Sequence, residues 1–316
     1  MSEPLPRFAD RDILAARPER NRLDPRRPYA FLTEPECNAR GEVVDVATLF
    51  LSNRECPFRC LMCDLWKNTF EHSVTADDIV EQVGWGLAQL PPAREVKLYN
   101  SGNFFDRQAI PRDAWEPIAN LVRTFDTVIV ENHPKLCDAS CREFRDLIAP
   151  ATLEIAIGLE TCHPEMLATL NKRMTLDDFD AAADELHTAG IRTRAFLLHG
   201  LPFLDESEIT EWTGRSIEYA FKRGVDCCSV IPTRVGNGMM ERLAEEAHFT
   251  PPNGASLEDV FQRGLAIGPG RVFVDLWDAA QFFPCNHCRD RRLARLRQMN
   301  LRQIVLPPVT CLRCRP

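Results

Sequence analysis

Six short apolar segments alternate with amphipathic segments through the middle of this 316-residue chain, and this alternation constrains the fold most. The apolar segments are rich in valine, leucine and isoleucine, as strands buried on both faces of a parallel sheet are; they span residues 43–51, 95–100, 127–131, 153–159, 193–199 and 226–232. The amphipathic segments have the spacing of helices with one apolar face, and they span residues 75–89, 112–124, 138–148, 175–189 and 206–222. Strands and helices that alternate in this way predict an α/β fold, a partial or complete parallel (β/α) barrel.

Composition divides the chain into three regions. Residues 1–42 are rich in proline and charge, which predicts an N-terminal arm with little regular structure. The barrel is expected over residues 43–236. Residues 237–316 are expected to form a small cysteine-rich C-terminal domain, with a helix over 256–265 and a strand over 271–276.

Three cysteines that follow the first predicted strand point to metal chemistry. Cys56, Cys60 and Cys63 have the spacing C-x3-C-x2-C, and a short loop of this kind can turn three thiolates towards one point. Three cysteines are one fewer than a 4Fe–4S cluster needs for complete ligation by protein, so one iron is left for another ligand. Structural zinc normally takes four ligands, and free cysteines can also be buried as small apolar residues. The spacing after a strand favours the cluster.

This cysteine motif resembles that of the radical S-adenosylmethionine (radical-SAM) superfamily. The resemblance implies an enzyme in which Cys56, Cys60 and Cys63 bind a 4Fe–4S cluster and the free iron chelates SAM. An electron from the cluster then cleaves SAM to a 5′-deoxyadenosyl radical, while the protein orients the cofactors. Family members often have an aromatic residue before the third cysteine, where it packs on the adenine. Here the residue is Met62, and a thioether can also pack against an adenine face.

Polar residues follow other predicted strands, where a barrel gathers its chemistry. Ser101, Gly102 and Asn103 come after the second strand and look like the counterpart of the family's Gly-Gly-Glu segment, which holds the SAM amine, although no glutamate is present. A simple turn is the alternative. His133 comes just after the third strand and His199 ends the fifth, where a histidine can act as an acid or base or have a structural role.

The fourth predicted strand is followed directly by Glu160, in the sequence Gly158-Leu159-Glu160. Together with Leu-Asn-Lys at residues 170–172, it resembles the signature of the radical-SAM branch that includes the Elongator catalytic subunit and the tRNA methylthiotransferases. We expect the Glu160 carboxylate to accept hydrogen bonds from the SAM ribose. A plain surface salt bridge is the alternative.

Four further cysteines form two C-x2-C pairs near the C-terminus, separated by 22 residues: Cys285, Cys288, Cys311 and Cys314. Four thiolates in two such pairs match a closed tetrahedral zinc site. A second iron–sulfur cluster also takes four cysteines, so zinc is favoured but the auxiliary cluster remains open. The other cysteines are expected to pack in the core.

The charge distribution is uneven. The whole chain has a net charge of −8, whereas residues 285–316 contain eight arginines and one aspartate, for a net charge of +7. A basic region on an acidic protein favours a polyanionic partner, although a solvated charged face is the common alternative. Because the chain also resembles the Elongator and archaeosine-synthesis radical-SAM proteins, we expect it to modify a tRNA or a nucleoside.

Two other functions remain open from the sequence. One is a radical-SAM enzyme that acts on a small molecule or peptide and uses an auxiliary cluster; the other is a non-catalytic metal-binding adaptor. The resemblance also implies an electron donor such as a flavodoxin or ferredoxin. No segment approaches about 18 consecutive apolar residues, and the first residues lack an apolar signal region. We therefore expect no membrane partner and a cytoplasmic location.

Overall fold

The computed structural model describes residues 4–314, and it contains one sheet whose eight strands lie in chain order. Every neighbouring pair from β2 to β8 is parallel, whereas β1 and β2 are antiparallel. The strands are β1 (Ala30–Cys37), β2 (Val43–Phe50), β3 (Glu95–Tyr99), β4 (Thr127–Asn132), β5 (Thr152–Glu160), β6 (Arg192–His199), β7 (Cys227–Pro232) and β8 (Arg271–Val274). Since β1 and β8 are not neighbours in this described sheet, it is a curled, open barrel. The predicted partial (β/α) barrel is confirmed.

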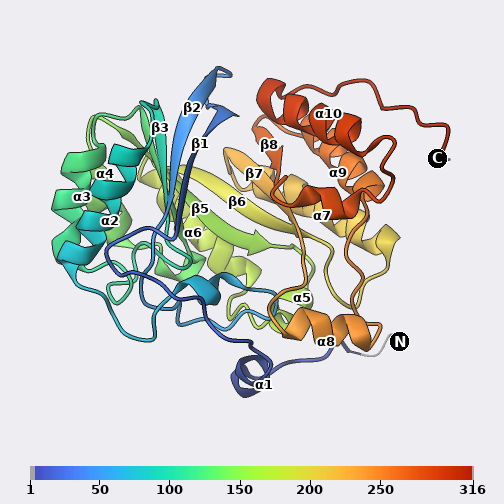
Figure 1. Cartoon of the computed structure of the whole chain (residues 1–316), viewed down its shortest axis with the longest axis horizontal. Coiled ribbons are helices and arrows are strands. Elements are labelled where there is room, and N and C mark those ends of the chain that lie inside the picture. The colour runs from blue at the N-terminus through green and yellow to red at the C-terminus, as the bar shows by residue number, and fades with distance from the viewer. Residues whose placement is uncertain (1–3, 315–316) are drawn as a thin grey trace.

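Helices connect the parallel strands and cover the sheet, with α2, α3 and α4 against one half and α7, α9 and α10 beside the other (Figure 1). The longer helices are α2 (Ala76–Gln89), α3 (Trp115–Val122), α4 (Ala139–Leu147), α6 (Leu176–Thr188), α7 (Glu206–Lys222), α9 (Gly254–Ile267) and α10 (Arg289–Arg302). The short ones are α1 (Asp10–Ala15), α5 (Met166–Thr169), α8 (Met239–Glu245) and the 3₁₀ turns η1 (Leu65–Asn68), η2 (Arg112–Ala114), η3 (Pro134–Leu136) and η4 (Ala279–Phe282). Among the described helices, none is long and apolar enough to cross a membrane.

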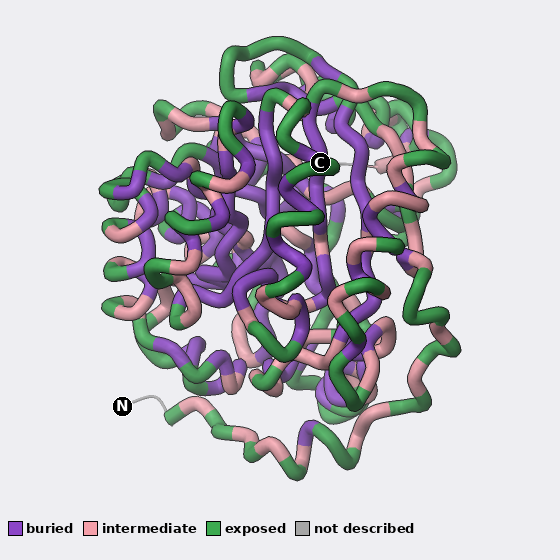
Figure 2. The backbone as a smooth tube through the Cα atoms, turned by 90° about the vertical axis from the view of Figure 1, so that its left-hand side faces the viewer, coloured by how far each residue is buried: buried purple, intermediate pink, exposed green. Residues whose placement is uncertain are grey.

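The main core lies between the sheet and these helices. All six residues of β4 are buried, as expected for a strand covered on both faces. Figure 2 shows the strands as buried segments, surrounded by helices whose outer turns are exposed. Two of the helices begin where the sequence signals a start, because Thr75 and Thr175 each cap the first turn and pair with an aspartate three residues later.

The N-terminal region is more regular than its composition predicts. β1 lies within residues 1–42 and pairs with β2 over its whole length. Pro35 within β1 obscures this strand in the sequence, because proline cannot donate to a ladder. β1 has a partner on one side only among the described residues, and an edge strand tolerates proline.

The C-terminal region extends the barrel. β8 adds the last strand to the sheet, in parallel with β7. The outer edge of β8 is covered by α10 and the residue after it, because the side chains of Asn300 and Gln303 form hydrogen bonds with the backbone of Val274 and Val272. These side chains take the place of a further strand at this edge.

Candidate functional site

The loop after β2 carries Cys56, Cys60 and Cys63, at the edge where the parallel strands end. The Cys60 side chain is buried and the other two are partly buried. The three thiols are electrostatic neighbours, since the charge of Cys56 acts on Cys60 and the charges of both act on Cys63. The Cys63 amide donates a hydrogen bond to the Cys60 carbonyl at 3.2 Å, which closes a tight turn. The loop therefore brings the three predicted ligands together.

The surroundings of this cysteine trio fit a group that carries positive charge. Burial raises the pKa of all three thiols, that of Cys60 to about 12. A bound metal centre reverses this effect, because a coordinating thiol loses its proton outright. Asn103 also favours the thiolate of Cys56, since its Nδ2 donates to the Cys56 Sγ at 3.1 Å. Soft thiolates in such a place suit an iron–sulfur cluster.

The N-terminal region clamps the cysteine loop through Glu55. This buried carboxylate accepts hydrogen bonds from Arg17 at 2.7 Å and from Arg20, and it forms an ion pair with Arg59 at 3.0 Å. The Arg17 guanidinium also lies over the Trp66 ring, 4.5 Å from its centroid. The sequence analysis missed this clamp, although an acidic residue beside the first cysteine was a visible signal.

A second apolar cluster, separate from the main core, packs against the same loop. It joins α1, α5 and α8, which Figure 1 shows together at one end of the sheet, and it includes the fully buried Leu61. Met62, predicted to face the adenine, packs against this cluster with part of its surface exposed. Asn237 ties α8 to the loop, since its Nδ2 donates to the Leu61 carbonyl at 2.7 Å while its Oδ1 accepts from the Met240 amide.

The segment after β3 lies beside the cysteine loop, and its role in holding SAM stays a prediction. A Cβ atom at Gly102 would stand 3.6 Å from the Cys56 Cβ. The Ser101 hydroxyl donates to the Tyr29 hydroxyl at 3.0 Å. Just before them, both side-chain amide atoms of Asn100 are buried without a hydrogen-bond partner among the described residues. Such groups normally have a partner, which can be an ordered water or a ligand, so this segment offers polar groups that a bound cofactor could satisfy.

Glu131 shapes this segment from the neighbouring strand. Its Oε1 accepts hydrogen bonds from the amides of Asn100 at 2.7 Å and Gly102 at 3.3 Å. Burial raises the pKa of Glu131 to about 7, although these amides act in the opposite direction. The sequence analysis gave no role to Glu131, which is the last residue of a predicted strand.

We predict that Glu131→Gln reduces the pH dependence of stability. In the unfolded chain this carboxyl titrates near its usual value of 4.5, and in the folded protein near about 7. Between these values the folded protein binds more protons, so its free energy of unfolding falls as the pH rises. Glutamine keeps the acceptor oxygen and removes the titration. As the pH rises across this window, the free energy of unfolding of the variant should increase by up to about 3 kcal/mol relative to that of the wild type, as measured by urea unfolding. If the free energies of the two proteins changed in parallel with pH, the prediction would be contradicted.

Glu160 forms a buried ion pair with Lys172, whose Nζ lies 2.5 Å from the Glu160 Oε1. Burial alone would lower the pKa of Lys172, but the charge of Glu160 outweighs it and holds that pKa above its usual value. The salt bridge that the sequence left as an alternative is thus present, within the protein rather than on its surface. It occupies Oε1, and the role of Glu160 towards a ribose stays a prediction.

Gly158 makes room for this ion pair. A Cβ atom at residue 158 would overlap both the Glu160 carboxylate and the Lys172 ammonium. The glycine, the glutamate and the lysine of the predicted signature are therefore linked by packing.

The residues around Lys172 also hold the cysteine loop. Asn171 Nδ2 donates to the Arg59 carbonyl at 2.8 Å, and the Leu61 amide donates to the Leu170 carbonyl at 2.9 Å. The Lys172 charge acts on Cys60 and Cys56 and lowers their thiol pKa values. The 170–172 segment therefore positions the loop and offsets part of its negative charge.

We predict that Gly158→Ala destabilises the protein, because the added methyl group must displace the buried ion pair. Overpacking of this kind costs about 1–3 kcal/mol, and less iron should remain bound after reconstitution. Gly84→Ala is the matched control. Gly84 lies in α2, where the nearest atom to an added Cβ is 3.8 Å away, and alanine in a helix stabilises by up to about 1 kcal/mol. Equal thermal stability of the two variants would contradict the prediction.

Both predicted histidines form hydrogen bonds with other residues of the protein. His133 Nε2 lies 3.0 Å from the Lys172 carbonyl, its Nδ1 accepts from the Lys135 amide, and its ring stacks on Phe58 with the centroids 3.7 Å apart. His199 is fully buried, and its ring nitrogens lie 3.1 and 3.0 Å from hydroxyl groups of α7 and α9. Burial lowers the pKa of His133 to about 3 and that of His199 to about 4. These contacts favour structural roles for both.

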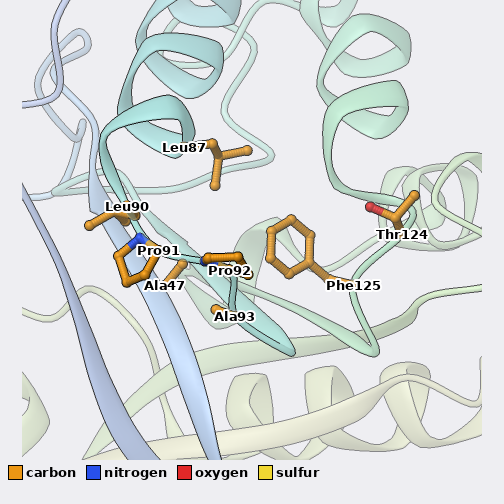
Figure 3. Close-up of a pocket in the computed structure, with 8 residues that line it drawn as sticks. All are labelled: Ala47, Leu87, Leu90, Pro91, Pro92, Ala93, Thr124 and Phe125. Atoms are coloured by element: carbon orange, nitrogen blue, oxygen red, sulfur yellow. The ribbon is translucent and has the colours of Figure 1, made fainter.

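The hollows on the described surface include one far from the candidate site and one beside it. The first, of about 350 Å³, is shown in Figure 3 and is formed by residues before β3 and β4, at the edge of the sheet opposite the cysteine loop. It is therefore separate from the candidate site. The second, of about 320 Å³, borders Asn171 and includes Arg7, Lys135 and Arg173. It lies next to the candidate site, and its lining combines these three basic side chains with the acidic Asp178.

The C-terminal cysteines form a separate site. Cys285, Cys288, Cys311 and Cys314 converge so that their sulfur atoms all lie within 4.8 Å of one another. Cys288 stands immediately before α10, and its Sγ lies 3.5 Å from that of Cys314. This group could bind a metal ion, as the two C-x2-C pairs predict.

Curated relatives are found among archaeal proteins. An uncharacterized protein of Methanocaldococcus jannaschii is 23% identical over 267 residues, which cover 79% of this chain and 73% of that protein. The archaeosine synthase subunit beta of Thermococcus kodakarensis is 27% identical over 202 residues, which cover 61% of this chain and 62% of that protein. The latter match spans less than two thirds of the relative.

A family model and a solved structure complete the comparison. Coproporphyrinogen III oxidase of Escherichia coli, described as a radical SAM enzyme, matches with a TM-score of 0.50 and 16% identity, over 82% of this chain and 55% of that one. This likeness concerns the fold alone. The model of the radical SAM superfamily matches residues 51–214, which begin just before the cysteine loop and make up just over half of the chain. The chain therefore belongs to the radical SAM superfamily and is an enzyme of that class.

Proposed function

We propose that this enzyme binds a 4Fe–4S cluster through Cys56, Cys60 and Cys63, cleaves SAM, and uses the resulting radical to modify a nucleoside of tRNA. The observation that carries the first part is that one loop brings one buried and two partly buried thiols together beside the orphaned amide of Asn100. When bound, the cluster supplies the electron that divides SAM into methionine and a 5′-deoxyadenosyl radical. A flavodoxin or ferredoxin would supply that electron to the cluster.

The protein's own residues would position SAM. The segment Ser101–Asn103 would hold its amino acid part. It lies beside Cys56 and directly follows Asn100, whose side-chain amide has no hydrogen-bond partner among the described residues. Glu160 would accept from the ribose through the carboxylate oxygen that Lys172 leaves free. Met62 would lie against the adenine.

Similarity to an archaeosine synthase subunit beta supports a tRNA substrate. The surface adds a second argument, because α10 and the segment that follows expose arginines to solvent: Arg291, Arg297, Arg302 and Arg313. Not every arginine of the region is free to contact tRNA. Arg292 is paired with Glu258 at 2.7 Å, and the buried Arg295 donates to the Leu306 carbonyl. Arg315 lies outside the described residues.

Two assays on the full chain test this function. Anaerobically reconstituted protein with a reductant should convert SAM to 5′-deoxyadenosine, and addition of unfractionated tRNA should change the yield and leave a modified nucleoside detectable by mass spectrometry. If SAM binds but is never cleaved, the protein acts as an adaptor. If SAM is cleaved but no tRNA changes, the substrate is a small molecule or peptide.

Binding measurements separate the tRNA hypothesis from general activity. Alanine substitution of Arg291, Arg297 and Arg302 together should weaken tRNA binding and reduce the slope of log affinity against log salt by about 3, if each contacts one phosphate. A matched triple variant changes arginines that are exposed elsewhere: Arg40, Arg107 and Arg123. An equal loss in both variants would contradict a tRNA surface on α10.

A further inference from the structure

The geometry of the four C-terminal cysteines points to one metal ion rather than a cluster: we propose that Cys285, Cys288, Cys311 and Cys314 bind a single zinc ion, which fastens the C-terminal segment to α10. This proposal is independent of the tRNA function.

The size of the site carries the argument. Four sulfurs at about 2.3 Å from one zinc ion form a tetrahedron whose edges are about 3.8 Å long. The four sulfurs here all lie within 4.8 Å of one another, and those of Cys288 and Cys314 are 3.5 Å apart. A four-iron cluster places each cysteine on a different iron, so its sulfur ligands stand much farther apart than those around one ion. The site is therefore too small for an auxiliary cluster.

The first cysteine pair closes a tight turn at the start of α10. The amides of Cys288 and Arg289 both donate to the Cys285 carbonyl, at 3.3 and 3.0 Å, and Cys288 stands immediately before the helix. This turn fixes the positions of the first two thiols relative to α10.

The fold brings the second pair back to the first. The segment after α10 returns along the helix because the Arg295 side chain donates to the carbonyls of Leu306 and Pro307 at 2.6 and 2.8 Å. Beyond these contacts the segment is weakly attached, since Leu312 is fully exposed and α10 reaches it through a long hydrogen bond of 3.5 Å from Arg291 to the Thr310 carbonyl. A metal ion would therefore be the main attachment of residues 308–314.

Zinc is the ion that the donor set favours. Thiolates bind zinc more tightly than ferrous iron, and a closed site with four cysteines is typical of structural zinc. No open position remains for a substrate, so the ion would have a structural role, and the chain would carry iron only in the loop after β2.

Metal analysis of the full chain and of two variants tests the proposal. Wild-type protein, reconstituted anaerobically, should contain about one zinc and about four irons. The double substitution Cys311→Ala with Cys314→Ala should remove the zinc and keep the iron, whereas Cys60→Ala should remove the iron and keep the zinc. About eight irons without zinc, or iron in place of zinc in the C-terminal site, would overturn the assignment.

A measurement on the wild type covers the case in which the double variant does not fold. Protein produced with cobalt should show the intense visible bands of tetrahedral Co²⁺ bound by thiolates, and one equivalent of zinc should remove them. Removal of zinc from the wild-type protein should also increase the rate of tryptic cleavage after Arg302 and Arg313 severalfold. Weak cobalt bands typical of an octahedral oxygen site, or an unchanged cleavage rate, would refute the proposed attachment.

Discussion

Replacing Cys60 by alanine is expected to abolish 5′-deoxyadenosine formation and to remove the iron of the loop after β2. Cys60 is the buried member of the trio and the central one in the chain. With two thiolates left, the cluster would lack a protein ligand in addition to its open iron, and its loss would stop the reaction at the first step. Iron content, the visible absorption of the cluster and product formation should fall together.

The matched control is Cys37→Ala. Cys37 is also buried, at 3% exposure, but it ends β1 opposite the start of β2, at the edge of the sheet remote from the cysteine loop. It packs against Cys227 and Phe273, so the change should cost about 1 kcal/mol in stability and leave iron and activity in place. If the Cys60 variant still cleaved SAM at the wild-type rate, the assignment of the trio would fail.

The fold could be predicted because its signal repeats. Parallel strands covered on both faces leave continuous apolar runs, and the predicted strands 95–100 and 193–199 differ from β3 and β6 by a single residue at one end. Capping residues such as Thr75 added defined starts for helices. β1 could not be found in this way, because an edge strand with a proline has neither a continuous apolar run nor a regular alternation.

The site was predictable only where chemistry dictates residue type. Three cysteines at fixed spacing indicate a metal centre from sequence alone. Glu131, Glu55 and Asn237 support that centre through contacts between distant segments, and such contacts leave no local pattern. Arg295 shows the converse: it belongs to the basic region, where charged side chains usually face solvent, but the returning C-terminal segment buries it and supplies its hydrogen-bond acceptors.

Lys172→Met is expected to destabilise the protein by about 4 kcal/mol, because it leaves the Glu160 carboxylate buried without its partner. Both side chains of this ion pair are less than 10% exposed, so water cannot replace the lost ammonium. The same change removes a positive charge that lowers the thiol pKa values of Cys60 and Cys56. Cluster assembly should therefore also slow, which iron uptake during reconstitution would measure.

Two further variants distinguish the effect of losing the ion pair from the effect of losing the lysine side chain. Lys222→Met makes the same replacement in the pair with Glu218, where the two groups are 3.9 Å apart and exposed, and it should change stability by less than about 0.5 kcal/mol. Adding Glu160→Gln to Lys172→Met removes the uncompensated charge, so the double variant should recover a large part of the loss in urea unfolding. If the double variant were no more stable than Lys172→Met, the loss of stability would come from the missing packing of the lysine side chain. The buried ion pair would then not be the contact that holds the end of β5 beside the cysteine loop.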